Sequence, residues 1–122
     1  MKIKRAHNAT NTNDALHVDD MQATIKHVKD MDISVVVPLY NEEESLPELY
    51  RWIEKVMKAN GFSFEVIFVN DGSTDNSWQV IEDLSKQSEN VKGIKFRRNY
   101  GKSPALYCGF KEAQGDVVIT MD

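Results

Sequence analysis

The sequence has little cysteine, no long apolar run and no large excess of either charge, and each shortage excludes a class of protein. One cysteine in 122 residues, Cys108, cannot form an intramolecular disulfide. No stretch approaches the roughly 18 apolar residues of a membrane-spanning helix, and residues 1–10 lack the apolar core of a secretory signal. A net charge of −4 gives no general case for binding nucleic acid. We expect one small globular domain in a reducing, cytoplasmic setting.

Residues 1–31 differ in composition from the rest of the chain. They hold all three histidines and a polar tract at 8–14, and they contain no Phe, Tyr or Trp. Such a segment buries too little apolar area to offset the entropy of ordering it. We therefore predict a flexible leader over residues 1–31, with a short helix near 21–29, followed by a folded domain over 32–122. Met31 stands directly before that domain, and a translation start at this residue is a hypothesis that the intact mass of the native product would test.

Strand-like and helix-like patterns alternate from residue 32 onward. Short apolar or β-branched runs begin at Ile33, Phe64, Val91 and Asp116. Between them, apolar residues recur every three or four positions, which predicts three amphipathic helices. The strand starts are 31, 27 and 25 residues apart, which are the lengths of successive βαβ units. We therefore predict an α/β, Rossmann-like parallel sheet with right-handed crossovers.

Capping residues indicate where these helices begin and end. Ser45, with Glu48 three residues later, forms a capping box for the first helix, and Asn60-Gly61 supplies its stop. Ser103 is the expected N-cap of the third helix and Gly115 its expected end. Trp78, Tyr107 and Phe110 are expected in the core, and Cys108 is expected to be a packed helix residue.

Four polar loops follow the predicted strands, at the sheet edge where ligands bind in open parallel folds. They are residues 38–42, 70–75 and 97–102 and the position of Asp122. The sequence Gly-Lys-Ser at 101–103 resembles the end of a P-loop, but the required earlier glycine is a phenylalanine. No G-x-G-x-x-G follows the first strand. Neither a P-loop ATPase nor an NAD enzyme is supported.

Two features of these loops each have two interpretations. The carboxylate of Asp71 could bind a nucleobase or ribose, or it could open the next helix through an Asx-turn. The basic residues between positions 92 and 102 could face a nucleotide or an acceptor phosphate, or they could form a solvated strand edge. For Lys92 and Lys95 we favour the solvated edge. Arg98 and Lys102 are the candidates for phosphate contact.

Four segments in order resemble family 2 glycosyltransferases. They are VVVPLYNEE at 35–43, VNDGSTD at 69–75, FRRNYGKSPAL at 96–106 and GDVVITMD at 115–122. The third segment is similar to the dolichyl- or undecaprenyl-phosphate sugar transferase branch. The resemblance covers residues 32–122 and none of the leader. It implies the first half of a GT-A fold and transfer of a sugar from a nucleotide-diphosphate donor, with inversion, to a polyprenyl-phosphate acceptor.

The resemblance also implies site residues. The first loop would line the nucleoside pocket, Asp71 would bind the base, and Asp122 matches the first aspartate of a D-x-D motif that binds ribose and Mg²⁺ or Mn²⁺. With Lys102 added, the candidate nucleotide-sugar-binding residues are Pro38, Tyr40, Asn41, Glu42, Asp71, Lys102 and Asp122.

The sequence stops inside that D-x-D motif. The expected catalytic base and the acceptor-binding half are absent, so we predict donor binding without sugar transfer by this chain alone. The strand at 116–121 would be an unpaired apolar edge, which favours aggregation and marginal stability. The complete protein would act at the cytoplasmic face of a membrane.

Two alternative functions stay open. A GT-A-like nucleotidyltransferase would need a glycine-rich loop after the first strand, and residues 38–42 contain no glycine. A nucleotide-binding module without turnover is the other alternative. The donor base, the sugar and the oligomeric state are not determined by the sequence.

Overall fold

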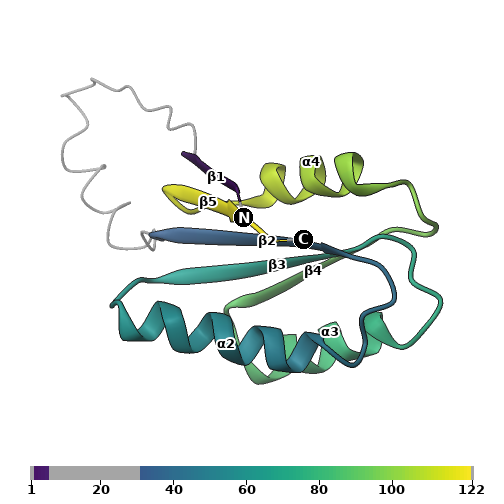
Figure 1. Cartoon of the computed structure of the whole chain (residues 1–122), viewed down its shortest axis with the longest axis horizontal. Helices are drawn as coiled ribbons and strands as arrows, with labels where there is room; N and C mark the ends of the chain where they lie inside the picture. The colour runs from purple at the N-terminus through teal and green to yellow at the C-terminus, as the bar shows by residue number, and fades with distance from the viewer. Residues whose placement is uncertain (1, 6–30, 122) are drawn as a thin grey trace, which may run out of the picture.

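A computed structural model of the chain describes residues 2–5 and 31–121 (Figure 1). These residues form one five-stranded sheet of order β1-β5-β2-β3-β4. The strands are β1 (Lys2–Arg5), β2 (Ile33–Leu39), β3 (Phe64–Asn70), β4 (Val91–Lys95) and β5 (Val117–Thr120). The helices are α2 (Leu46–Ala59), α3 (Ser77–Gln87) and α4 (Lys102–Glu112). Strands β2 to β5 pair in parallel, which confirms the predicted α/β architecture.

Helices cover both faces of the sheet. Helices α2 and α3 lie on one face and α4 lies alone on the other (Figure 1). Along β2, Val35 and Val37 pack toward α2 and α3, whereas Val36 packs toward α4. This alternation explains why the strand is apolar at successive positions, as expected of a strand buried on both sides. Among the helices described, none is long and apolar enough to cross a membrane.

The start of α2 differs from the predicted capping box. Ser45 is the N-cap residue, but its hydroxyl donates to Glu42 Oε2 at 2.8 Å and makes no cap bond. Instead, the backbone N–H groups of Ser45 and Leu46 both donate to the Glu42 carbonyl at 3.2 Å. The helix end is confirmed, because Gly61 has a φ of 72° and its N–H donates to the carbonyl of Lys58 at 3.1 Å.

The predicted ends of α4 are also wrong. Gly101, with a φ of 104°, is the N-cap residue, so Ser103 lies inside the helix. The helix ends at Glu112, before Gly115. A Cβ on Gly115 would lie 2.5 Å from the backbone nitrogen of Ser34. Gly115 therefore permits the close approach of the α4–β5 turn to β2 rather than ending a helix.

Strand β1 corrects the prediction of an unpaired edge. It pairs antiparallel with β5, with Lys2 opposite Thr120 and Arg5 opposite Val117. Strand β5 therefore has a partner on both sides, β1 and β2. The helix predicted near residues 21–29 lies outside the described residues, as does the rest of the segment 6–30.

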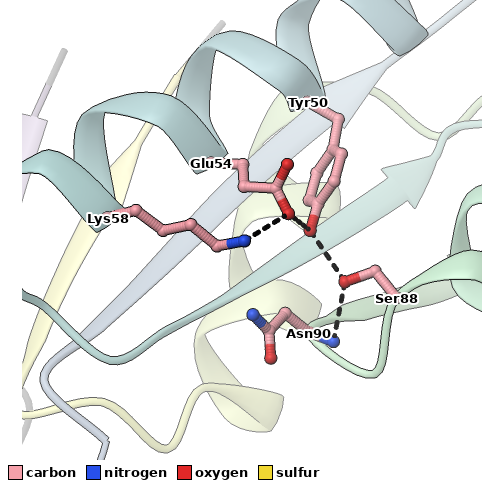
Figure 2. A network of polar contacts seen from close by, with 5 residues as sticks. All are labelled: Tyr50, Glu54, Lys58, Ser88 and Asn90. Carbon is pink, nitrogen blue, oxygen red and sulfur yellow. Dashed lines mark hydrogen bonds and ion pairs between the residues drawn. The ribbon is translucent and has the colours of Figure 1, made fainter.

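A polar network joins α2 to the end of α3 (Figure 2). The Tyr50 hydroxyl lies 2.7 Å from Ser88 Oγ, and Ser88 Oγ accepts from the backbone N–H of Asn90 at 3.3 Å. On the α2 side, Glu54 Oε2 accepts from Tyr50 at 3.4 Å and lies 3.3 Å from Lys58 Nζ. Burial raises the pKa of Tyr50, so its hydroxyl stays protonated within this contact between the two helices.

Candidate functional site

A cleft of about 460 Å³ lies at the carboxyl end of β2. Its lining residues are Val37, Pro38, Leu39, Tyr40, Glu42, Ser45, Leu46, Leu49 and Met121. The volume falls within the range of about 300–1,000 Å³ that is typical of small-molecule sites. The cleft thus brings together three predicted site residues, Pro38, Tyr40 and Glu42. The sequence analysis missed the contributions of Ser45, Leu46, Leu49 and Met121.

Tyr40 and Glu42 give the cleft an aromatic ring and a carboxylate. The Tyr40 side chain is 45% exposed, so a ligand can reach it. Glu42 is exposed, and its Oε2 accepts the Ser45 hydroxyl. Its backbone N–H donates to Ser77 Oγ at 2.9 Å, which fixes the loop against α3. Met121, which follows β5, also lines the cleft. Asp122, the next residue, lies outside the described part of the structure.

Asn41 stands between these two residues but does not line the cleft. Its backbone is left-handed, with a φ of 54°, and its N–H donates to Ser73 Oγ at 2.9 Å. The amide oxygen accepts from the backbone N–H groups of Thr74 at 2.8 Å and Asp75 at 3.2 Å. The side chain therefore joins the β2–α2 loop to the β3–α3 loop. Asparagine tolerates the left-handed conformation better than most residues do.

Asp75 fixes the start of α3. Its Oδ1 accepts from the backbone N–H of Ser77 at 2.9 Å and from the Ser77 hydroxyl at 2.6 Å, and its Oδ2 accepts from the Glu43 N–H at 3.3 Å. Desolvation acts to raise the pKa of Asp75, but these hydrogen bonds outweigh it and hold the pKa below the usual value. The carboxylate therefore stays ionised at neutral pH.

Asp71 lies beneath the neighbouring β4–α4 loop. It is 5% exposed, and its carboxylate accepts from the backbone N–H groups of Tyr100 at 2.7 Å and Gly101 at 3.0 Å. The Asx-turn considered for Asp71 is not formed, and Asn70 instead accepts from Ser73 N–H at 3.1 Å. A carboxylate offers about four lone-pair sites, so Asp71 retains capacity for a further donor.

Gly72 brings two loops into direct contact. Its φ is 73°, and a Cβ added there would lie 2.1 Å from the carbonyl carbon of Arg98. Together with the bonds of Asp71, this close approach fixes the β4–α4 loop against the end of β3. Lys102, the first residue of α4, is exposed directly after that loop. Neither Asp71 nor Lys102 is among the residues that line the cleft.

The basic cluster divides into residues with different roles. Lys92 lies on the edge strand β4 with its side chain 41% exposed, as expected of a solvated edge, and its Nζ also lies 2.8 Å from Oε1 of the buried Glu65. Lys95 is exposed and its Nζ lies 5.7 Å from the ring centroid of Trp78. Arg98 places its guanidinium carbon 4.9 Å from the ring centroid of Tyr100. Lys92 is therefore both a residue of the solvated edge and the ion-pair partner of a buried carboxylate.

A buried polar network centred on Glu65 was missed by the sequence analysis. Glu65 is 1% exposed, and its Oε2 accepts from Ser34 Oγ at 2.6 Å and from Gln114 N–H at 2.7 Å. Gly115 N–H donates to Ser34 Oγ at 2.8 Å. Burial acts to raise the pKa of Glu65, but Lys92 and these hydrogen bonds lower it further than burial raises it. The network ties the α4–β5 turn to β2 and β3.

Two of the three aromatic residues that were expected in the core pack there, and one does not. Trp78 and Phe110 pack against the two apolar clusters, as predicted. Tyr107 is 62% exposed, so its prediction as a core residue is wrong. The buried residues of α4 are Ala105 and Gly109, which face the sheet. Tyr107 lies on the opposite side of the helix, so its ring is exposed to solvent. Cys108 is half-buried with a free thiol.

The donor atoms at the cleft can be compared with the needs of a divalent metal. Within residues 31–121, no three His, Cys, Asp or Glu side chains gather as a metal site. Among the described residues, the carboxylate that lines the cleft is that of Glu42; Asp122 follows Met121 in the sequence and lies outside them. Mg²⁺ often takes one or two carboxylates and completes its shell with substrate phosphates. The residues therefore fit a metal that is held jointly with a diphosphate.

Sequence comparisons identify relatives of this chain. The profile of glycosyl transferase family 2 matches residues 34–122. The undecaprenyl-phosphate 4-deoxy-4-formamido-L-arabinose transferase of Pseudomonas fluorescens (strain SBW25) is 46% identical over 91 residues, which cover 74% of this chain and 27% of that protein. The chain thus spans about a quarter of the length of that relative.

Solved structures agree with the predicted fold. S. aureus TarS 1-349 in complex with UDP-GlcNAc matches with a TM-score of 0.63 and 31% identity, over 75% of this chain and 26% of that chain. The mannosyltransferase PcManGT from Pyrobaculum calidifontis, in complex with GDP-Man and Mn²⁺, matches with a TM-score of 0.60 over 85% of this chain and 33% of that chain. At 21% identity the second likeness concerns the fold alone. The prediction of the first part of a GT-A fold is confirmed.

Proposed function

Because the chain belongs to glycosyl transferase family 2, we propose that residues 32–122 form the donor-binding part of an inverting glycosyltransferase. The observation that carries this proposal is the cleft at the end of β2. Pro38, Tyr40 and Glu42 lie there together with Met121, the residue that precedes Asp122. A ligand in this cleft would meet the residues of the first and the last motif at once.

The donor in this proposal is a nucleotide-diphosphate sugar. The exposed ring of Tyr40 offers a surface on which a base can stack, and Asp71 has capacity left for a base N–H. Lys102 stands at the N-terminal end of α4, where a phosphate is favoured by both the lysine charge and the helix dipole. Asn41 contributes indirectly, by joining the two loops that carry Tyr40 and Asp71.

A divalent metal completes the proposed donor site. Asp122 would hold Mg²⁺ or Mn²⁺ together with the diphosphate, since its carboxylate oxygens suit either ion. Such a metal neutralises charge that develops on a leaving diphosphate. The UDP-GlcNAc bound to S. aureus TarS supports a nucleotide-diphosphate sugar as the donor class.

The acceptor and the chemistry belong to the complete protein. The name of the Pseudomonas relative supports a polyprenyl-phosphate acceptor, and the complete enzyme would meet this lipid at the cytoplasmic face of a membrane. Inversion requires a carboxylate that deprotonates the acceptor, and we assign no residue of this chain to that role. We therefore expect the 122-residue chain to bind donor without transferring sugar.

Calorimetric titration of the chain with UDP and with GDP, each with and without Mn²⁺, tests the proposal. We expect one of the two nucleotides to bind, and to bind more tightly with the metal. Tyr40→Ala should weaken that binding about tenfold, because one stacked base contributes roughly 1–3 kcal/mol. Tyr107→Ala is the matched control, since Tyr107 is exposed on α4 and should leave nucleotide affinity unchanged. Absence of binding to either nucleotide, or equal losses in both variants, would contradict the proposal.

A further inference from the structure

The segment from β4 to the end of α4 is the basic part of an acidic chain. Residues 91–112 contain six Lys or Arg and one acidic residue, Glu112, whereas the whole chain has 15 Lys and Arg against 19 Asp and Glu. The remainder of the chain therefore has nine basic and eighteen acidic residues, a net charge of −9. Such a separation of charge creates a local positive potential on a molecule that is negative elsewhere.

Most of this positive charge lies on the surface. Lys92 is paired with Glu65, and Lys95 leans over Trp78 of α3 on the other side of the sheet. The remaining cations are exposed and accompanied by two exposed tyrosines. Lys102 belongs to the proposed phosphate site, so we call the other five residues the basic face, which consists of Arg97, Arg98, Tyr100, Tyr107 and Lys111.

Tyr100 of the loop and Tyr107 and Lys111 of the helix lie on the same side of the sheet. Tyr100 packs edge-on against Phe96, with ring centroids 5.6 Å apart, and Phe96 packs against the apolar cluster beneath α4. In α4, Ala105 is buried toward the sheet, so Tyr107 and Lys111, four residues apart, lie on the outer stripe. Among the described elements, α4 is the outermost on its side (Figure 1).

We propose that the basic face docks on the anionic headgroups of a membrane. Tyrosine rings and Lys or Arg side chains are the groups that proteins place at a lipid headgroup layer. Here each ring has a cation beside it, with Arg98 4.9 Å from the Tyr100 centroid and Lys111 5.6 Å from the Tyr107 centroid. A flat, negatively charged surface would therefore meet both kinds of group together.

The inference rests on and deepens the proposed function. A polyprenyl-phosphate acceptor lies in a membrane, and the loop that carries Tyr100 also bonds to Asp71 through the Tyr100 and Gly101 N–H groups. Docking through this loop would hold the donor site at the height of the lipid phosphate. The same contact explains why an acidic chain keeps its positive charge next to that loop.

Co-sedimentation of the 122-residue chain with vesicles tests the inference. The vesicles are phosphatidylcholine alone, or phosphatidylcholine with about one-third phosphatidylglycerol. We expect binding only to the anionic vesicles, and weaker binding as salt is raised. The variant Arg97→Gln/Lys111→Gln should reduce affinity about tenfold or more, since each lost cation near the surface weakens binding several-fold. The control Lys55→Gln/Lys86→Gln removes the same charge from α2 and α3 and should change affinity less than about twofold.

Several results would overturn the inference. They are equal losses in the two double variants, equal binding to neutral vesicles, and loss of binding only when the cations of β1 are removed by Lys2→Gln/Lys4→Gln. Binding of a single-stranded oligonucleotide without vesicle binding would assign the face to a nucleic acid. A dimer that is lost in Arg97→Gln/Lys111→Gln would assign it to a second copy.

The vesicle assay contains no nucleotide, so it separates the two proposals. Nucleotide binding without vesicle binding overturns the membrane inference and leaves the donor site intact. Vesicle binding without nucleotide binding supports the basic face and contradicts the proposed donor site.

Discussion

The two ends of the sheet are held together by different means. At the carboxyl end, neighbouring loops are joined by bonds from Asn41 and Asp71 to backbone N–H groups and by the close approach at Gly72. At the opposite end, the buried Glu65 carboxylate and Lys92 tie the α4–β5 turn to two strands. At this end, the Glu65 carboxylate is buried and bonded to Lys92 and the Gln114 N–H, so it stabilises the fold and is not available to a ligand. The end with hydrogen-bonded loops keeps the side chains of Tyr40 and Glu42 accessible in the cleft.

The largest expected difference concerns two glycines, one at each end. Gly72→Ala should destabilise the fold by about 3 kcal/mol or more, because a left-handed backbone and a clash with Arg98 backbone atoms act together. Gly61 has almost the same backbone, with a φ of 72°, but nothing lies within 4 Å of its added Cβ. Gly61→Ala should therefore cost only about 1 kcal/mol. Urea unfolding measures both, and equal costs would show that the loops at the carboxyl end can separate freely.

The next effect probes the network at the other end. Glu65→Ala should cost about 2–3 kcal/mol, because it leaves Lys92, Ser34 and the Gln114 N–H without their acceptor. Glu89→Ala is the control, since Glu89 is exposed and should change the free energy of unfolding by under about 0.5 kcal/mol. A Glu65→Ala variant as stable as this control would show that the buried carboxylate does not hold the turn.

Asn41 tests the joined loops at the carboxyl end. Asn41→Ala removes the acceptor of two backbone N–H groups and puts alanine at a φ of 54°, for a cost of about 1–2 kcal/mol. Hydrogen exchange at the amides of Thr74 and Asp75 should become faster. Asn41→Asp keeps an acceptor oxygen in the same place and should retain their protection. Unchanged exchange in Asn41→Ala would show that the two loops are held by other contacts.

The smallest effect is the pH dependence of stability. The pKa of Glu65 is lowered in the folded state, so its contribution is present above the ordinary carboxyl pKa of about 4.3 and is lost as the pH falls through the folded value. Chemical unfolding below about pH 5 should therefore show a stability loss that is shallower in Glu65→Gln. Asp75 titrates in the same direction and supplies part of the remaining slope. An unaltered slope in Glu65→Gln would contradict the lowered pKa.

Local signals were sufficient to predict the parallel core. Continuous apolar runs predicted β2 and β3, because strands buried on both faces have few polar positions to interrupt them. The strand order then placed residues 38–42 at the ligand edge, which led to three lining residues of the cleft. These predictions succeed because they depend on residues that are close together in the sequence.

Long-range contacts account for what could not be predicted. The role of Asn41 depends on Thr74, 33 residues away, and the role of Glu65 on Gln114, 49 residues away. Polar positions in otherwise apolar runs, Ser34 in β2 and Glu65 in β3, were the available sign of the buried network, because they pair in register. Strand β1 has four residues, too few for its alternation to stand out from a charged segment.

The pairing of β1 with β5 also constrains the order of folding. Lys2 pairs with Thr120, so this ladder closes a loop that contains the entire parallel core. Contacts between residues so far apart in the sequence form late, because closing the long loop costs conformational entropy before the pairing stabilises the chain. The parallel strands are therefore expected to assemble first, with β5 transiently open along one side. Until β1 arrives, that open side is the place where a nascent chain is most vulnerable to joining the wrong partner.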